Sequence, residues 1–110
     1  MGNEVAYKEE KLANGWFVLG VQGQVSRLTA DGVYQKGEEV VSREARTAID
    51  LSGVDYLSSA GIRVFLRLLK KAKKEGKEFT AVGAAGDVKS VLVDSNMATL
   101  LNMRDTRDDL

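Results

Sequence analysis

Three residue types with distinctive chemistry are missing from this chain of 110 residues, which has no cysteine, no histidine and no proline. Without cysteine the chain forms no disulfide, and without cysteine and histidine it has no zinc site built from those ligands. The same two absences exclude Ser-His and Cys-His catalytic pairs. Because proline is absent, no break in a helix or strand can be assigned to it.

Net charge and long apolar runs are missing as well. Sixteen basic and sixteen acidic residues give a formal net charge of zero, so no overall field attracts nucleic acid or a membrane. No stretch approaches the roughly 20 apolar residues of a membrane span, and the N-terminus lacks the pattern of a signal peptide. The rest of the composition is ordinary for a globular protein. We expect one soluble, cytoplasmic domain spanning residues 1–110, with no metal and no cofactor.

The first part of the chain has the pattern of a β-hairpin. A weak strand pattern over residues 5–11 leads to Asn14-Gly15, a dipeptide typical of hairpin turns. Residues 16–21 are rich in aromatic and β-branched side chains and form the expected partner strand. Over residues 26–41 apolar positions are sparse and two glycines interrupt, so we expect only a short or frayed helix there.

The best-defined elements lie in the middle of the chain. Residues 46–51 have the short apolar pattern of a buried strand, which a Ser-Gly turn at residues 52–53 should end. Residues 60–75 form an amphipathic helix that ends at Gly76, and residues 77–83 form the next strand. Together they make a right-handed parallel βαβ unit. The helix has an apolar stripe of Ile62, Phe65, Leu66, Leu69 and Ala72, and a basic face of Arg63, Arg67, Lys70, Lys71 and Lys74, interrupted by Val64.

The C-terminal part of the chain adds a second short helix, which we expect Asp87 to cap and which ends near Ser95. Residues 97–103 should complete the core, and the charged residues 104–110 should form a frayed tail or a last turn. The predicted fold class is α/β: a single-layer mixed β-sheet, made of the N-terminal hairpin and the parallel βαβ unit, packed with helices.

Two adjacent hydroxyl side chains, Ser58 and Ser59, mark the predicted start of the central helix. A helix start presents free N–H groups and the positive end of the dipole. One interpretation is that a serine here only caps the helix. The other is phosphorylation, which adds about −1.5 to −2 charges and changes what docks on this surface. The small Ala60 and Gly61 are explained equally by tight packing against the sheet and by keeping a hydroxyl reachable.

Catalysis and nucleic-acid binding have less support. Asp50 and Asp55 flank a strand end, where active-site carboxylates are common in α/β folds, but a capping role in the turn explains them more simply. The chain has no G-x-x-x-x-G-K phosphate loop, and nothing places a lysine base beside either serine. The basic helix face is solvated surface or a footprint for an acidic protein partner, since no aromatic residues interleave with it. We expect a protein without enzymatic activity and without catalytic residues.

Residues 50–63 read Asp-Leu-Ser-Gly-Val-Asp-Tyr-Leu-Ser-Ser-Ala-Gly-Ile-Arg. This stretch resembles the signature of STAS domains, specifically the single-domain bacterial anti-sigma factor antagonists. The family motif runs from a strand through D-L-S-x-V, an aromatic and an apolar residue to Asp-Ser-Ser/Thr/Ala-Gly-Leu at a helix start. Weaker similarity covers most of the chain: residues 23–26 stand where the family often has Gly-Glu-Leu-Asp, and residues 77–79 resemble the start of the next family strand.

The resemblance implies a STAS-like fold and regulation by partner switching. The unphosphorylated antagonist binds an anti-sigma factor, itself a serine protein kinase of the histidine-kinase-like ATPase superfamily, and so releases the sigma factor. Phosphorylation of the motif serine blocks this binding; that serine is Ser59 here, with Ser58 as the nearest substitute. A serine phosphatase is the other implied partner, and ATP belongs to the kinase. Two departures weaken the acidic surface near the site, because Ser58 replaces the motif aspartate and Gln24 and Ser26 replace an earlier acidic pair.

The expected docking surface is the loop before the central helix together with the first turns of that helix. It comprises Asp55, Tyr56, Leu57, Ser58, Ser59, Ala60, Gly61, Arg63, Val64 and Arg67. Two other functions stay open. One is a STAS-like accessory subunit of a transporter or sensory complex, in which the same surface docks constitutively. The other is a small-ligand or nucleotide-binding module that uses the helix N-terminus as an anion site.

Overall fold

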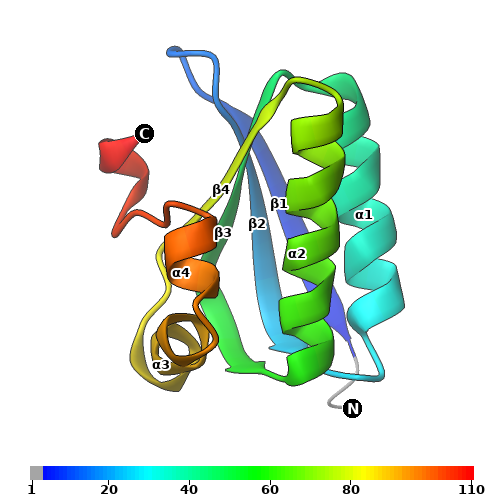
Figure 1. Ribbon diagram of the computed structural model, residues 1–110, viewed down its shortest axis with the longest axis vertical. Coiled ribbons are helices and arrows are strands. Elements are labelled where there is room, and N and C mark those ends of the chain that lie inside the picture. The colour runs from blue at the N-terminus through cyan, green and yellow to red at the C-terminus, as the bar shows by residue number, and fades with distance from the viewer. Residues whose placement is uncertain (1–3) are drawn as a thin grey trace.

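The computed structural model describes residues 4–110 and contains one mixed β-sheet with helices packed on it (Figure 1). The strands are β1 (Val5–Lys11), β2 (Phe17–Val25), β3 (Arg46–Leu57) and β4 (Glu78–Val82), in that spatial order. β1 and β2 form an antiparallel hairpin, whereas β2, β3 and β4 run parallel to one another. The predicted α/β fold, with a hairpin joined to a parallel βαβ unit, is confirmed.

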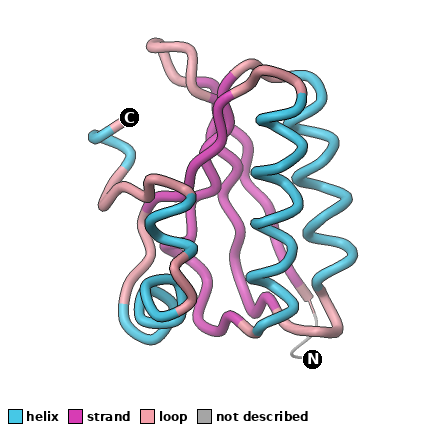
Figure 2. The backbone as a smooth tube through the Cα atoms, viewed as in Figure 1, coloured by secondary structure: helices cyan, strands magenta, loops and turns pink. Residues whose placement is uncertain are grey.

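Two long helices, α1 (Ala30–Arg43) and α2 (Ser59–Lys74), lie side by side along the sheet, as Figures 1 and 2 show. The expectation of a short or frayed first helix was wrong, because α1 is a regular helix of 14 residues. Its Gly37 lets the two helices approach, since a Cβ at this position would lie 2.6 Å from Cδ1 of Leu68. Packing of this kind outweighs the low helix propensity of glycine.

β3 continues through the Ser-Gly pair at residues 52–53 to Leu57, so the turn predicted there was wrong. Opposite β2 the register shifts twice: two steps from Gly20 to Gln22 face three on β3, and the single step from Gly23 to Gln24 faces two. An extra residue on one strand is the mark of a β-bulge, which increases twist while keeping the strand intact. The Ser-Gly pair, which has the sequence pattern of a turn, therefore lies in a bulged part of a continuous strand.

The core lies between the sheet and the two long helices, with Phe65 of α2 fully buried in it. The buried face of α2 comprises Gly61, Val64, Phe65, Leu68, Leu69 and Ala72. The predicted stripe was therefore displaced: Leu68 and Val64 are buried, whereas Ile62 and Leu66 are only half-buried. The reason is that α2 packs against α1 as well as against the sheet, which widens its apolar face beyond one stripe.

The C-terminal part of the chain wraps around the free edge of β4. Helices α3 (Gly86–Asp94) and α4 (Met97–Leu100) lie at the β4 side of the molecule, away from α1 (Figure 1). Asp87 lies inside the first turn of α3, and the capping position belongs to Ala85, so the predicted Asp87 cap was wrong. After α4, a parallel bridge joins Val82 to Arg104.

The last residues of the chain are held in place, so of the two expected forms, a frayed tail or a last turn, the structure has the turn. A short 3-10 helix, η1 (Arg107–Asp109), begins after Thr106, whose side chain forms a capping box with Asp109. Arg104 N–H donates to the carbonyl of Ala81 at 3.0 Å, and Arg107 pairs with Asp50 and Glu10. One backbone hydrogen bond and the ion pairs of Arg107 thus attach this segment to the sheet.

Candidate partner-docking site

The two serines at the start of α2 have different surroundings. Ser58 is extended (φ −93°, ψ 174°), and its side chain makes no capping hydrogen bond. Instead its N–H and its hydroxyl both donate to the carbonyl of Val25, at 2.9 and 3.3 Å. Ser59 is the first residue of α2 and is exposed, and within the described part of the chain its hydroxyl has no hydrogen-bond partner. The capping interpretation therefore fails for Ser58, and Ser59 presents the free hydroxyl.

The small residues that follow have separate explanations. A Cβ on Gly61 would lie 2.8 Å from Cγ1 of Val25 and would also clash with Leu57, so glycine is required by packing at this position. Ala60 is half-buried and lines a surface hollow beside Ser59. Of the two explanations left open for the pair, tight packing therefore applies to Gly61.

Two hollows adjoin the start of α2. One lies between α2 and α3, has a volume of about 510 Å³, and is lined by Ser59, Ile62, Arg63, Val91, Asp94 and Ser95. The other lies between the starts of α1 and α2, has a volume of about 380 Å³, and is lined by Arg27, Ala30, Asp31, Ala60, Arg63, Val64 and Arg67. Arg63 takes part in both, so it stands between the two hollows.

The predicted docking residues fall into two groups in the structure. Exposed side chains that a partner can touch are Asp55, Tyr56, Ser59, Arg63 and Arg67; those buried or half-buried are Leu57, Ser58, Ala60, Gly61 and Val64. Val64 is only 3% exposed, so it does not interrupt the basic face as expected. Val64 lies at the bottom of the hollow between α1 and α2, because α1 packs against the side of α2 that carries it.

Several residues of this surface escaped the sequence analysis. Arg27 comes from the connection before α1, Asp31 comes from the first turn of α1, and Val91 and Asp94 come from α3. No local pattern pairs these segments with α2, because their proximity results from how three helices pack around the sheet.

Arg67 is held in place by an aromatic ring. Its guanidinium carbon lies 3.8 Å from the centroid of the Tyr34 ring on α1, which is a cation–π arrangement. This contact joins the two helices at the edge of the second hollow, while the guanidinium N–H groups at the rim of the stack remain available for an anionic group.

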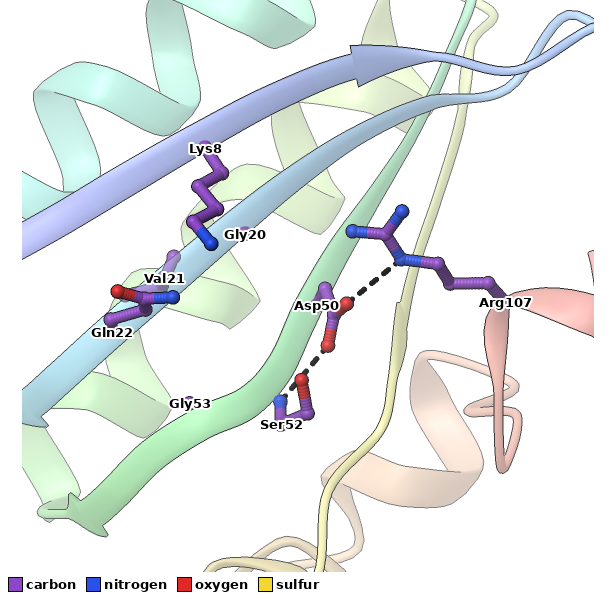
Figure 3. Close-up of a pocket in the computed structure, with 8 residues that line it drawn as sticks. All are labelled: Lys8, Gly20, Val21, Gln22, Asp50, Ser52, Gly53 and Arg107. Atoms are coloured by element: carbon purple, nitrogen blue, oxygen red, sulfur yellow. Dashed lines mark hydrogen bonds and ion pairs between the residues drawn. The ribbon is translucent and has the colours of Figure 1, made fainter.

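A separate polar hollow of about 130 Å³ lies on the sheet face opposite α1 and α2, and Figure 3 shows its lining. There Asp50 accepts a hydrogen bond from the Ser52 N–H at 2.9 Å and another from Nε of Arg107 at 3.0 Å. Burial acts to raise the pKa of Asp50, but the hydrogen bonds from Ser52 and Arg107 outweigh it, so the pKa lies below its usual value. Both carboxylate oxygens are thus engaged in holding the bulge and the C-terminal segment.

Residues 4–110 contain no group of three or more acidic side chains arranged to hold a metal ion. Nor do they contain a helix long and apolar enough to cross a membrane.

Comparison with known proteins decides the family. Residues 13–102 match the family model described as "Mlab, STAS domain". The chain belongs to the STAS domain family. Among curated proteins, BtrV of Bordetella bronchiseptica, whose assigned name describes it as an anti-sigma factor antagonist, is 26% identical over 96 residues, which is 86% of this chain and 83% of BtrV.

Solved structures share the architecture of this STAS domain. The crystal structure of an anti-sigma factor antagonist from Mycobacterium paratuberculosis superposes with a TM-score of 0.88 at 25% identity, covering 99% of this chain and 92% of that one. The Bacillus cell fate determinant SpoIIAA in its phosphorylated form gives a TM-score of 0.69 at 11% identity, covering 94% and 95%. The second likeness is one of fold alone.

Proposed function

We propose that this protein is an anti-sigma factor antagonist that acts by partner switching, with Ser59 as its phosphorylation site. The observation that carries the proposal is the free, exposed hydroxyl of Ser59 at the start of α2, next to a Ser58 held against Val25. The names of BtrV and of the Mycobacterium paratuberculosis protein support the role of antagonist. The partner is then an anti-sigma factor that is also a serine kinase, and the protein itself is a cytoplasmic regulator rather than an enzyme.

The switch follows from the position of the hydroxyl. When the Ser59 oxygen attacks the γ-phosphorus of ATP held by the kinase, the bond to ADP breaks and the hydroxyl proton is released. The serine gains about −1.5 to −2 charges. The free N–H groups and dipole at the start of α2 stabilise this charge locally, so the fold is kept. A docked partner, however, meets a hydrated dianion and is repelled, until a serine phosphatase removes the phosphate.

The test combines phosphorylation with binding. The full chain is incubated with ATP and the serine kinases encoded by neighbouring genes, and the phosphate is located by mass spectrometry. Calorimetry then compares wild type with Ser59→Asp, which we expect to bind the kinase at least about tenfold more weakly while its circular dichroism is unchanged. Failure of every such kinase to modify Ser58 or Ser59, or equal binding by Ser59→Asp, would contradict the proposal.

The same experiments separate the alternative functions. Constitutive binding to a transporter ATPase, unaffected by Ser59→Asp, would favour an accessory subunit. Saturable binding of a nucleotide by the protein alone, measured by calorimetry, would favour a ligand-binding module at the start of α2.

A further inference from the structure

We propose that the partner presents acidic side chains to a cluster of three arginines, Arg27, Arg63 and Arg67, beside Ser59. We call these residues the arginine cluster. The inference rests on the proposed function, because it names the chemistry of the partner that docks at the same surface. It adds that a phosphate on Ser59 competes with the partner's carboxylates for the same cations.

The arginine cluster is assembled by the fold. Arg27 lies in the connection between β2 and α1, whereas Arg63 and Arg67 lie in the second and third turns of α2. The hydrogen bonds from Ser58 to Val25 tie the end of β2 to the start of α2, which brings the connection beside the helix. All three side chains are exposed and line the hollow of about 380 Å³.

The positive charge of the arginine cluster is not neutralised within residues 4–110. None of its members forms an ion pair there, whereas other helical cations such as Lys36, Arg43 and Lys71 each pair with a glutamate. Asp31 is the single acidic residue lining the hollow, which leaves a local surplus of positive charge on a chain whose formal net charge is zero. Guanidinium groups in this state favour carboxylates, which they bind with paired hydrogen bonds.

The surroundings of the arginine cluster favour a protein partner over nucleic acid. Between the arginines the hollow is lined by Ala30, Ala60 and Val64, and a mixture of arginine and apolar surface is typical of protein interfaces. The nearby ring of Tyr34 is occupied by Arg67, so it offers no free face on which a base could stack. The occupant that fits is an acidic segment of the partner.

Arg63 connects this surface to the phosphorylation site. It lines the hollow that contains Ser59 as well as the hollow of the arginine cluster. It also follows Ser59 by four positions on α2, the spacing at which side chains on a helix are neighbours. A phosphate on Ser59 therefore gives Arg63 an anionic group from its own chain and at the same time repels the incoming carboxylates.

The test uses the purified full chain and a hexaglutamate peptide as the probe. In ¹⁵N NMR spectra, titration should cause saturable shifts of the Nε–Hε signals of Arg27, Arg63 and Arg67, and Arg27→Glu should weaken binding by about tenfold. Lys73→Glu is the matched control, since it makes the same charge change on an exposed residue near the far end of α2 and should change affinity by less than about twofold. Arg27→Gln repeats the test without charge reversal and should give a smaller loss.

Three outcomes would overturn the inference. The first is that hexaglutamate shows no saturable binding, and the second is that Lys73→Glu loses as much affinity for it as Arg27→Glu does. The third is displacement of hexaglutamate by oligothymidylate at equal concentration, which would indicate that the surface binds nucleic acid. Because this titration needs no kinase, its failure is distinguishable from failure of the switch. Phosphorylation of Ser59 without hexaglutamate binding would leave partner switching intact and refute the arginine cluster. Hexaglutamate binding without phosphorylation of Ser59 would refute the switch and leave the arginine cluster intact.

Discussion

The Nε atom of Arg107 donates to Oδ2 of Asp50 at 3.0 Å, across 57 positions of sequence. The same guanidinium also pairs with Glu10 on β1, so one side chain connects the C-terminal segment to two strands of the sheet. Arg104 lies over Trp16 nearby, with its guanidinium carbon 5.6 Å from the ring centroid. The last residues of the chain therefore cover part of the sheet face that α1 and α2 leave open.

The first prediction is that Arg107→Ala lowers the free energy of unfolding by about 1 kcal/mol. The side chain of Asp50 is only 12% exposed, so removal of its cationic partner lowers the free energy of unfolding more than removal of a partner at a solvated site. Urea denaturation measures the change. Arg46→Ala is the control, because both members of the Arg46–Glu78 pair are about half exposed and its loss should cost less than about 0.5 kcal/mol. Equal losses in the two variants would contradict the role given to Arg107.

The second prediction concerns pH. Because the pKa of Asp50 lies below its ordinary value of 3.8, its ionised form stabilises the folded state above that pH, and this contribution is lost as pH falls through the lowered pKa. Asp50→Asn keeps the shape of the side chain but does not titrate. The difference in unfolding free energy between wild type and Asp50→Asn should therefore be constant near neutral pH and shrink in acid, below about pH 4. A difference that does not change with pH would contradict it.

Local patterns were sufficient for the elements whose stability depends on neighbours in sequence. The hairpin at Asn14-Gly15 and the end of α2 at Gly76, which has a φ of +71°, were both predictable because a specific turn geometry needs a specific residue. The βαβ unit was predictable because its helix has a strong apolar period. The motif at the start of α2 indicated the family before any contact was known.

The remaining features depend on contacts between distant segments, which no local pattern encodes. α1 was underestimated because the packing of Gly37 against Leu68 of α2 is invisible in its own sequence. The bulges of β3 depend on pairing with β2, and the ordered C-terminal segment depends on Asp50. For the same reason Arg27 could not be assigned to the site until the fold placed it beside α2.

A third prediction uses two glycines in helices. Gly61→Ala should destabilise the protein by about 1–3 kcal/mol, because the added Cβ would meet Val25 and Leu57 in the packed core. Gly32→Ala should instead stabilise it by up to about 1 kcal/mol, since nothing lies within 4 Å of the new atom and alanine favours the helix. Thermal and urea unfolding of both variants measure the change in stability, which should be negative for Gly61→Ala and positive for Gly32→Ala. A gain of stability in Gly61→Ala would show that packing does not require glycine there.

A fourth prediction compares two buried threonines. The hydroxyl of Thr47 is buried without a hydrogen-bond partner in the described structure, so Thr47→Val should raise the free energy of unfolding by about 1 kcal/mol. The hydroxyl of Thr80 lies 2.9 Å from the carbonyl of Leu101, to which it donates. Thr80→Val removes this bond, leaves the carbonyl less well satisfied and should cost about 1–2 kcal/mol. Urea denaturation measures both changes. Changes in unfolding free energy of the same sign for the two variants would contradict the different roles given to the two hydroxyls.

The fifth prediction separates the two serines at the start of α2 by measuring stability and phosphorylation on the same variants. Ser58→Ala loses the hydroxyl bond to Val25 and should cost up to about 1 kcal/mol of stability, while phosphate incorporation by the cognate kinase continues. Ser59→Ala should change stability by less than about 0.5 kcal/mol, because its side chain is exposed, and should abolish incorporation. The crossed pattern is the informative result, since a fold defect would lower both quantities together. Incorporation lost in Ser58→Ala but retained in Ser59→Ala would move the modified hydroxyl to Ser58, and with it the surface on which the switch acts.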